Sequence, residues 1–154
     1  MQLISLLPSH HQRVTRSGNR RRLLLFDAGL PDLDQLLQGV AVGWQPLLIQ
    51  RDDDALTVIQ HHLDDCAHAN QPDNNAVEIA VVAHGAPGIV QIGSEPWSAE
   101  SVASRSQEWS ALPITHLDLY SCFVSQDIAF LRTLERISGA SVSARTHGCS
   151  TDSL

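Results

Sequence analysis

The stretch AVEIAVVAHGAPG, residues 76–88, decides the fold. Its first eight residues are almost all apolar and rich in Val and Ile, which predicts a strand buried on both faces. The run ends in His84-Gly85, and Pro87-Gly88 then marks a turn. Ligands of open parallel sheets bind beyond the carboxyl ends of the strands. A reactive side chain at such an end therefore indicates a functional edge.

Shorter apolar runs on either side of this stretch predict further strands. They lie at 23–27, 47–49, 115–120 and 141–144, and residues 89–93, between two glycines, predict a small hairpin arm. Helical spacing of apolar residues predicts helices over 31–39, 52–66, 98–112 and 125–137, the last with Ser125 as its N-cap. The alternation predicts an α/β fold, a three-layer α-β-α arrangement of a mainly parallel sheet with helices on both faces.

Length and charge bound the organisation of the chain. A chain of 154 residues corresponds to about one domain. Five arginines crowd the N-terminal end, so we expect a basic, loosely attached tail over 1–21, one domain over 22–147 and a short tail over 148–154. The net charge of −7 argues against nucleic acid or an anionic membrane as the main partner.

Membrane insertion and a cleaved signal peptide are not predicted. No apolar run approaches the ~18 residues that span a bilayer. The apolar start, Met1 to Leu7, is short, lacks a basic region and meets Pro8. Export by a signal beyond this chain stays open.

Neither a metal nor a cofactor is predicted. The three cysteines are Cys66, Cys122 and Cys149, an odd count at wide spacing that gives neither a disulfide framework nor a CxxC metal site. His61, His62 and His68 do not share a compact helix face. Phosphate binding is disfavoured because no strand leads into a glycine-rich phosphate loop.

Two reactive residues fall at predicted strand ends. His84 follows one strand, and Cys122 follows the next after Ser121. If these strands are neighbours, the imidazole can take the thiol proton, and a helix beginning just after Cys122 would favour the thiolate. The backbone N–H groups of Gly85 and Cys122 could form an oxyanion hole. The alternative is a packed, inert thiol, because cysteine is among the most buried residue types.

Three further residues could line a pocket at the same edge. Asp27 ends the first strand and could select a basic side chain, or cap the following turn. Asp118 shares strand parity with Cys122 and could orient a base, or simply be hydrogen-bonded. Phe123 could narrow a pocket. The remaining candidate, His116, is expected to be an ordinary strand residue.

The strand-end His-Gly and Cys pair resembles the caspase, legumain and gingipain group of cysteine peptidases. In caspases the His precedes the Cys by about 50 residues. Their Gln-Ala-Cys-Arg/Gln-Gly signature is replaced here by YSCFV, residues 120–124. The departure removes the caspase arginine pocket. The resemblance implies a caspase-like, flavodoxin-like sheet.

A closer resemblance covers about residues 22–147. The matching stretches are LFD at 25–27, HGAPG at 84–88, QIG at 91–93, LYSC at 119–122 and SGASV at 138–142. They resemble the bacterial domain of unknown function family 4347, which usually has Gly where Ser121 stands and a small or acidic residue where Phe123 stands. That family sits in very large secreted or surface repeat proteins. The resemblance implies an extracellular or cell-surface location, and a cytoplasmic one stays open.

Two functions follow. The first is a non-catalytic structural or binding module that contacts a protein or peptide. The alternative is a cysteine peptidase-like domain that processes itself or a neighbour with Cys122 and His84. The sequence leaves the oligomeric state and the substrate open.

Overall fold

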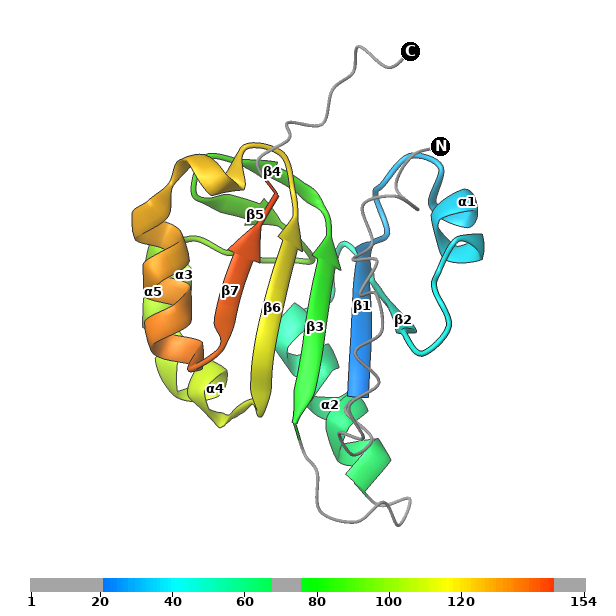
Figure 1. Ribbon diagram of the computed structural model, residues 1–154, viewed down its shortest axis with the longest axis horizontal. Coiled ribbons are helices and arrows are strands. Elements are labelled where there is room, and N and C mark those ends of the chain that lie inside the picture. The colour runs from blue at the N-terminus through cyan, green and yellow to red at the C-terminus, as the bar shows by residue number, and fades with distance from the viewer. Residues whose placement is uncertain (1–20, 68–75, 146–154) are drawn as a thin grey trace.

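The computed structural model describes residues 21–67 and 76–145, apart from the side chains of Cys66 and Ala67. A five-stranded parallel sheet forms its centre, and a two-stranded hairpin lies at one end (Figure 1). The elements in chain order are β1 (Arg21–Asp27), α1 (Leu33–Gln38), β2 (Gln45–Ile49), α2 (Ala55–Ala67), β3 (Val77–Val82), β4 (His84–Ala86), β5 (Ile89–Gln91), α3 (Ala99–Ser104), α4 (Ser106–Ala111), β6 (Ile114–Tyr120), the 3₁₀ turn η2 (Val124–Gln126), α5 (Ile128–Ser138) and β7 (Ser141–Ala144).

The sheet confirms the predicted α/β fold. Its strand order is β2-β1-β3-β6-β7, and every pairing in it is parallel. Counted along the chain, the order is 2-1-3-4-5, the doubly wound arrangement of flavodoxin-like sheets. The order reverses between β1 and β3, so these two strands flank the topological switch point. Strand β3 is buried at every position except Glu78, as expected for a strand covered on both faces.

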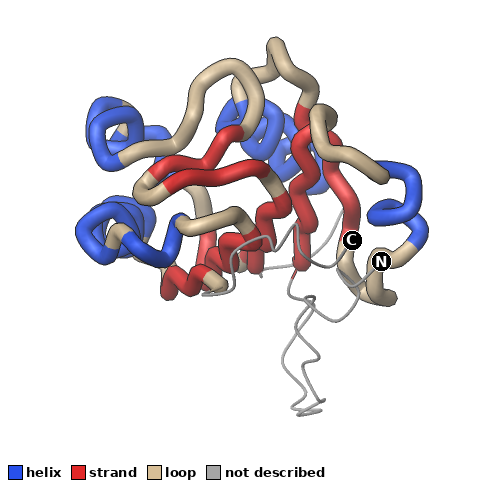
Figure 2. Tube along the Cα trace, turned by 90° about the horizontal axis from the view of Figure 1, so that it is seen from above, coloured by secondary structure: helices blue, strands red, loops and turns tan. Residues whose placement is uncertain are grey.

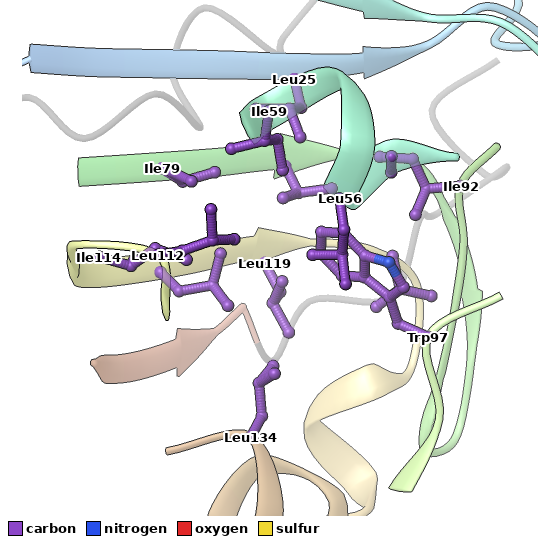
Figure 3. Close-up of a cluster of buried hydrophobic side chains, with 14 of the residues drawn as sticks. Leu25, Leu56, Ile59, Ile79, Ile92, Trp97, Leu112, Ile114, Leu119 and Leu134 are labelled. Atoms are coloured by element: carbon purple, nitrogen blue, oxygen red, sulfur yellow. The ribbon is translucent and has the colours of Figure 1, made fainter. Parts of the chain in front are cut away.

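The main core lies between the sheet and helices α2, α3, α4 and α5. Leucines and isoleucines from the strands meet apolar side chains of these helices (Figure 3). Trp97 and Trp109 join this core edge to face, with ring centroids 4.8 Å apart and an interplanar angle of 78°. Aromatic pairs prefer this geometry because the positive ring edge faces the negative ring face.

The opposite face of the sheet carries a smaller cluster. Its fully buried members are Leu24, Phe26, Trp44, Ala80, Val82 and Tyr120, and α1 packs against them through Leu33, Leu36 and Leu37. The third layer is thus α1, on the β1–β2 side of the sheet (Figure 1). Arg22 pairs with Glu78 at 3.3 Å and lies over the Trp44 ring at 5.8 Å.

Several boundaries differ from prediction, among them the following three. The single helix expected over 98–112 is two helices, because Arg105 leaves helical geometry between α3 and α4. Ser125 does not cap α5; it lies in η2, and the Asp127 carboxylate accepts the N–H of Phe130 at 3.0 Å. Arg21, assigned to the tail, is the first residue of β1. The predicted tails otherwise lie outside the described residues.

The two outer strands of the sheet, β2 and β7, are protected against pairing with a further strand. Pro46 in β2 has no N–H to offer. In β7, the Val142 N–H donates to the Glu135 carboxylate at 3.1 Å. Such devices blunt strand edges that would otherwise recruit another chain. Within the described residues, no helix combines the length and apolar character needed to cross a membrane.

Candidate functional site at the carboxyl edge of the sheet

The structure brings the two predicted strand ends together. Strands β3 and β6 are neighbours, and their register pairs Val82 with Tyr120. The Ala83 N–H continues the ladder by donating to the Tyr120 carbonyl at 3.4 Å. His84 and Cys122 each follow two residues after the last pair of this ladder, and His84 begins the hairpin strand β4. His84 is exposed, and Cys122 is half-buried.

Gly85 is packed directly against the turn that carries Cys122. A Cβ on Gly85 would meet the Cys122 carbonyl oxygen at 2.7 Å and the Ser121 Cβ at 2.8 Å. Val124 would lie equally close. A glycine after His84 is thus required by close packing of two chain segments. This packing accounts for the residue independently of the predicted oxyanion role.

The hairpin after His84 extends the contact. Strands β4 and β5 pair antiparallel at the edge of the main sheet (Figure 2). The hairpin tip holds Gly88 with φ of 71°, and a Cβ there would fall 2.4 Å from an Asp127 carboxylate oxygen. Because Asp127 also caps α5, the hairpin packs on the start of that helix. His84 and the loop 121–127 thus form one continuous surface.

The surroundings of Cys122 differ from prediction in two ways. Cys122 is followed by the short turn η2, and α5 begins only at Ile128. The expected helix start just after the thiol is therefore wrong. Cys122 is also disulfide-bonded in this structure, contrary to the expected absence of disulfides. The other two cysteines of the chain, Cys66 and Cys149, have side chains outside the described part.

Phe123 occupies an unusual backbone conformation. Its φ is 60° and ψ is 0°, in the left-handed region that bulky residues rarely adopt. Its side chain is 46% exposed, and Ile128, which starts α5 close by in the chain, is 60% exposed. Strained, exposed residues of this kind concentrate at functional surfaces. The predicted role of Phe123 in narrowing a pocket stays a prediction.

Ser121 is buried without a hydrogen-bond partner. It is 4% exposed, and its hydroxyl lacks a partner in the described structure. Ser121 lies two residues after Leu119, so its side chain points to the same side of the sheet. This side is the helix-covered face, which packs against α2, α3, α4 and α5. An unsatisfied buried hydroxyl carries a desolvation cost. Sequence reasoning noted Ser121 as a departure from the family pattern, but not its isolation.

The two predicted pocket acids are each engaged locally. Asp27 accepts the Gly29 N–H at 2.7 Å and so caps the turn after β1, one of its two predicted roles. Asp118 accepts a hydrogen bond from the hydroxyl of Ser143 in β7. Asp27 still lies at the switch-point edge, whereas Asp118 lies within β6.

A tyrosine–arginine pair near Cys122 was missed by sequence reasoning. Arg145 Nη2 donates to the Tyr120 hydroxyl at 3.3 Å, and its guanidinium lies 5.3 Å from the Tyr120 ring centroid. Burial raises the pKa of Tyr120, which the hydrogen bond from Arg145 opposes. A single Arg after a short strand gives no signal in the sequence. The contact requires β6 and β7 to be paired.

Two other described histidines, His62 and His116, contact polar side chains near them. His62 contacts the Gln45 side chain at 3.1 Å, and His116 contacts Thr115 Oγ1 at 3.2 Å. His68 lies outside the described residues. In the part of the chain that is described, no group of three or more His, Cys, Asp or Glu side chains is placed to hold a metal ion.

Comparison with known families now adds a finding. A family model described as Domain of unknown function (DUF4347) matches residues 23–151. The chain belongs to this family. The match spans the sheet except for the first two residues of β1, and it includes both strand ends of the candidate site. No curated protein matches the chain.

Proposed function

We propose that this family member is a non-catalytic protein-binding module, and that it binds through the carboxyl edge of the sheet. The observation that carries the proposal is the exposure of two apolar side chains, Phe123 and Ile128, in the segment after β6, at the edge where doubly wound sheets bind ligands. The backbone of Phe123 is also strained. Exposed aromatic side chains of this kind serve as anchors in protein interfaces.

A secreted or cell-surface location is part of the same proposal. It rests on the family resemblance. The disulfide at Cys122 supports it, because disulfides persist in oxidising compartments and are rare in the cytosol. The disulfide also favours binding over catalysis, since a sulfur in a disulfide is not a thiolate nucleophile.

A selection experiment tests the binding edge. Peptides selected from a displayed random library on the wild-type protein are measured by fluorescence anisotropy against a double variant, Phe123→Asn with Ile128→Ser. Asn tolerates the left-handed backbone, so the loop keeps its shape. We expect at least about a tenfold loss of affinity, the effect of removing apolar anchors.

The matched control is Val42→Ser. Val42 is fully exposed, at 102%, on the loop before β2. It should bind the selected peptides as the wild type does. Equal binding by the double variant, or an equal loss in the Val42 variant, would contradict the proposal.

The alternative function is a cysteine peptidase-like processing domain. The pairing of β3 with β6 favours it, because His84 and Cys122 each follow one of these neighbouring strands within two residues. In the reduced protein, the Cys122 thiolate would attack a peptide carbonyl, and His84 would take the thiol proton and give it to the leaving amine.

Thiol reactivity distinguishes the two functions. Iodoacetamide alkylation of the reduced protein is followed against pH by mass spectrometry, with His84→Ala as the control. An unperturbed thiol titrates near 8.5. Rapid reaction of Cys122 well below that pH, lost in His84→Ala, supports the processing domain. Reaction no faster than that of Cys149 sinks it and leaves the binding module.

A further inference from the structure

A groove lies on the helix-covered face, between α2 and α4 and away from the carboxyl-edge site. Its volume is about 410 Å³, within the range of binding pockets. The helix α4 packs extensively on α5. The lining residues are Leu56, Thr57, Gln60, His61, Asp64, Gln107, Glu108, Ala111 and Leu112.

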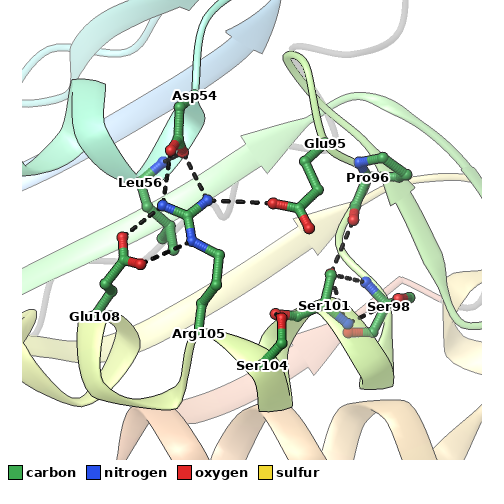
Figure 4. Close-up of polar contacts among 9 residues, drawn as sticks. All are labelled: Asp54, Leu56, Glu95, Pro96, Ser98, Ser101, Ser104, Arg105 and Glu108. Atoms are coloured by element: carbon green, nitrogen blue, oxygen red, sulfur yellow. Dashed lines mark hydrogen bonds and ion pairs between the residues drawn. The ribbon is translucent and has the colours of Figure 1, made fainter.

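One salt-bridge network joins the two walls of the groove. Arg105 Nη1 and Nη2 bind both Asp54 carboxylate oxygens, at 2.9 and 2.7 Å, and so tie the start of α4 to the start of α2 (Figure 4). The same guanidinium binds Glu108 and, at 3.4 Å, Glu95. One cation thus faces three carboxylates, and of these Glu108 lines the groove.

The floor and the rim of the groove differ in character. The side chains of Leu56 and Leu112 are 3% and 4% exposed and form an apolar floor. The carboxylates of Asp64 and Glu108 stand on opposite walls, and Gln60 Nε2 donates to Asp64 at 2.9 Å. An apolar floor between carboxylates suits a side chain with an aliphatic stem and a cationic head.

We propose that this groove binds an arginine side chain, with an apolar neighbour, from a partner polypeptide. The guanidinium pairs with the Asp64 carboxylate and shares the Glu108 carboxylate with Arg105, which already binds both Glu108 oxygens, because its planar fork matches carboxylate geometry. The stem and the neighbouring apolar side chain cover Leu56 and Leu112. This second surface is separate from Phe123 and Ile128, so either proposal can fail alone.

The test uses the full chain and two fluorescein-labelled peptides. One is acetyl-ALRLA-amide, and the other replaces its Arg with citrulline, which keeps the shape and removes the charge. We expect the arginine peptide to bind at least about tenfold more tightly, the scale of a charge-assisted pair. Equal affinities, or no binding of the arginine peptide, would overturn the proposal.

Paired variants locate the contact. Asp64→Asn should weaken binding about fivefold, whereas Asp65→Asn, on the same helix but outside the groove, should stay within about twofold. Ala111→Trp should block the groove, and Ala103→Trp on α3 should not. Circular dichroism checks that each variant folds. Equal losses in Asp64→Asn and Asp65→Asn would mean nonspecific charge attraction and would overturn the site.

Discussion

Side chains on the helix-covered face and at the carboxyl edge of the sheet differ in how well they are packed and hydrogen-bonded. On the face, the tryptophans pair edge to face and Arg105 is bound by three carboxylates. At the edge, Ser121 is buried without a partner and Phe123 is strained and exposed. Consistent packing stabilises a fold, while departures from it concentrate at functional sites. The difference locates stability on the face and the candidate function at the edge.

The largest expected effect tests the stability of the face. Trp109→Ala removes a side chain that is 1% exposed and packs edge to face with Trp97. We expect the free energy of unfolding to fall by about 3–5 kcal/mol, measured by urea titration. Trp44→Ala, in the thinner layer, should cost less because that ring is at the boundary of exposure, at 9%. Equal losses of unfolding free energy in the two variants would contradict this expectation.

The next effect concerns close packing at the edge. Gly85→Ala forces a methyl group against Cys122, Ser121 and Val124, so unfolding free energy should fall by about 1–3 kcal/mol. Gly139→Ala is the control. Its φ of 72° is strained, but nothing lies near the added Cβ, and about 1 kcal/mol is expected. A smaller loss for Gly85 would show that the two strand ends are not in contact.

A smaller effect concerns the salt-bridge network of the face. Arg105→Gln should lower unfolding free energy at pH 7 by about 1–2 kcal/mol, because paired, hydrogen-bonded charges contribute more than single exposed pairs. Hydrogen bonds from Arg105 lower the pKa values of Asp54 and Glu108. Their contribution is present above the unfolded carboxyl pKa values, near 4, and is lost as the pH falls through the lowered ones.

The difference between wild type and Arg105→Gln should therefore shrink on acidification below about pH 4. Guanidinium titrations across that range measure it. The exposed Arg132, on α5, offers a control: Arg132→Gln should change stability by no more than about 0.5 kcal/mol. A difference that grows toward low pH would contradict the network.

The smallest effect has the opposite sign. Ser121→Ala removes a buried hydroxyl that lacks a partner in the described structure, so the free energy of unfolding, measured by urea titration, should rise by about 1 kcal/mol. Ser138 is the matched control, since its hydroxyl donates to the Leu134 carbonyl at 2.6 Å and accepts the Ala140 N–H. Ser138→Ala should lower the free energy of unfolding by about 1 kcal/mol. A loss in both variants would mean that Ser121 has a partner.

The sheet was predictable because its signals are local and strong. A buried parallel strand such as β3 must be apolar on both faces, and His84-Gly85 marks its end unmistakably. Strand alternation also predicted that His84 and Cys122 follow successive strands, and these strands, β3 and β6, are neighbours. The break at Arg105 was not predictable, because residues 98–112 have continuous helical spacing. At the break, Arg105 contacts Asp54, which is far away in the chain.

The site was predicted in part for the same reason. Asp27 as a turn cap is a local hydrogen bond, readable from its position before Gly29. The late start of α5 was misjudged, since Ser125 and Asp127 are both good N-caps and only packing chooses between them. The stacking of Arg145 on Tyr120 and the isolation of Ser121 have no counterpart in sequence periodicity.

The apolar pattern of the sequence established the α/β class, a mainly parallel sheet and the strand ends that carry His84 and Cys122. These follow from the repeat of apolar side chains, which the backbone geometry of strands and helices converts directly into buried faces. The folded structure was needed to show the packing of Gly85 on the Cys122 turn, the strain at Phe123 and the contact of Arg105 with Asp54 beside the acidic groove. Each depends on segments distant in the chain, whose meeting is set by the summed packing of the whole domain.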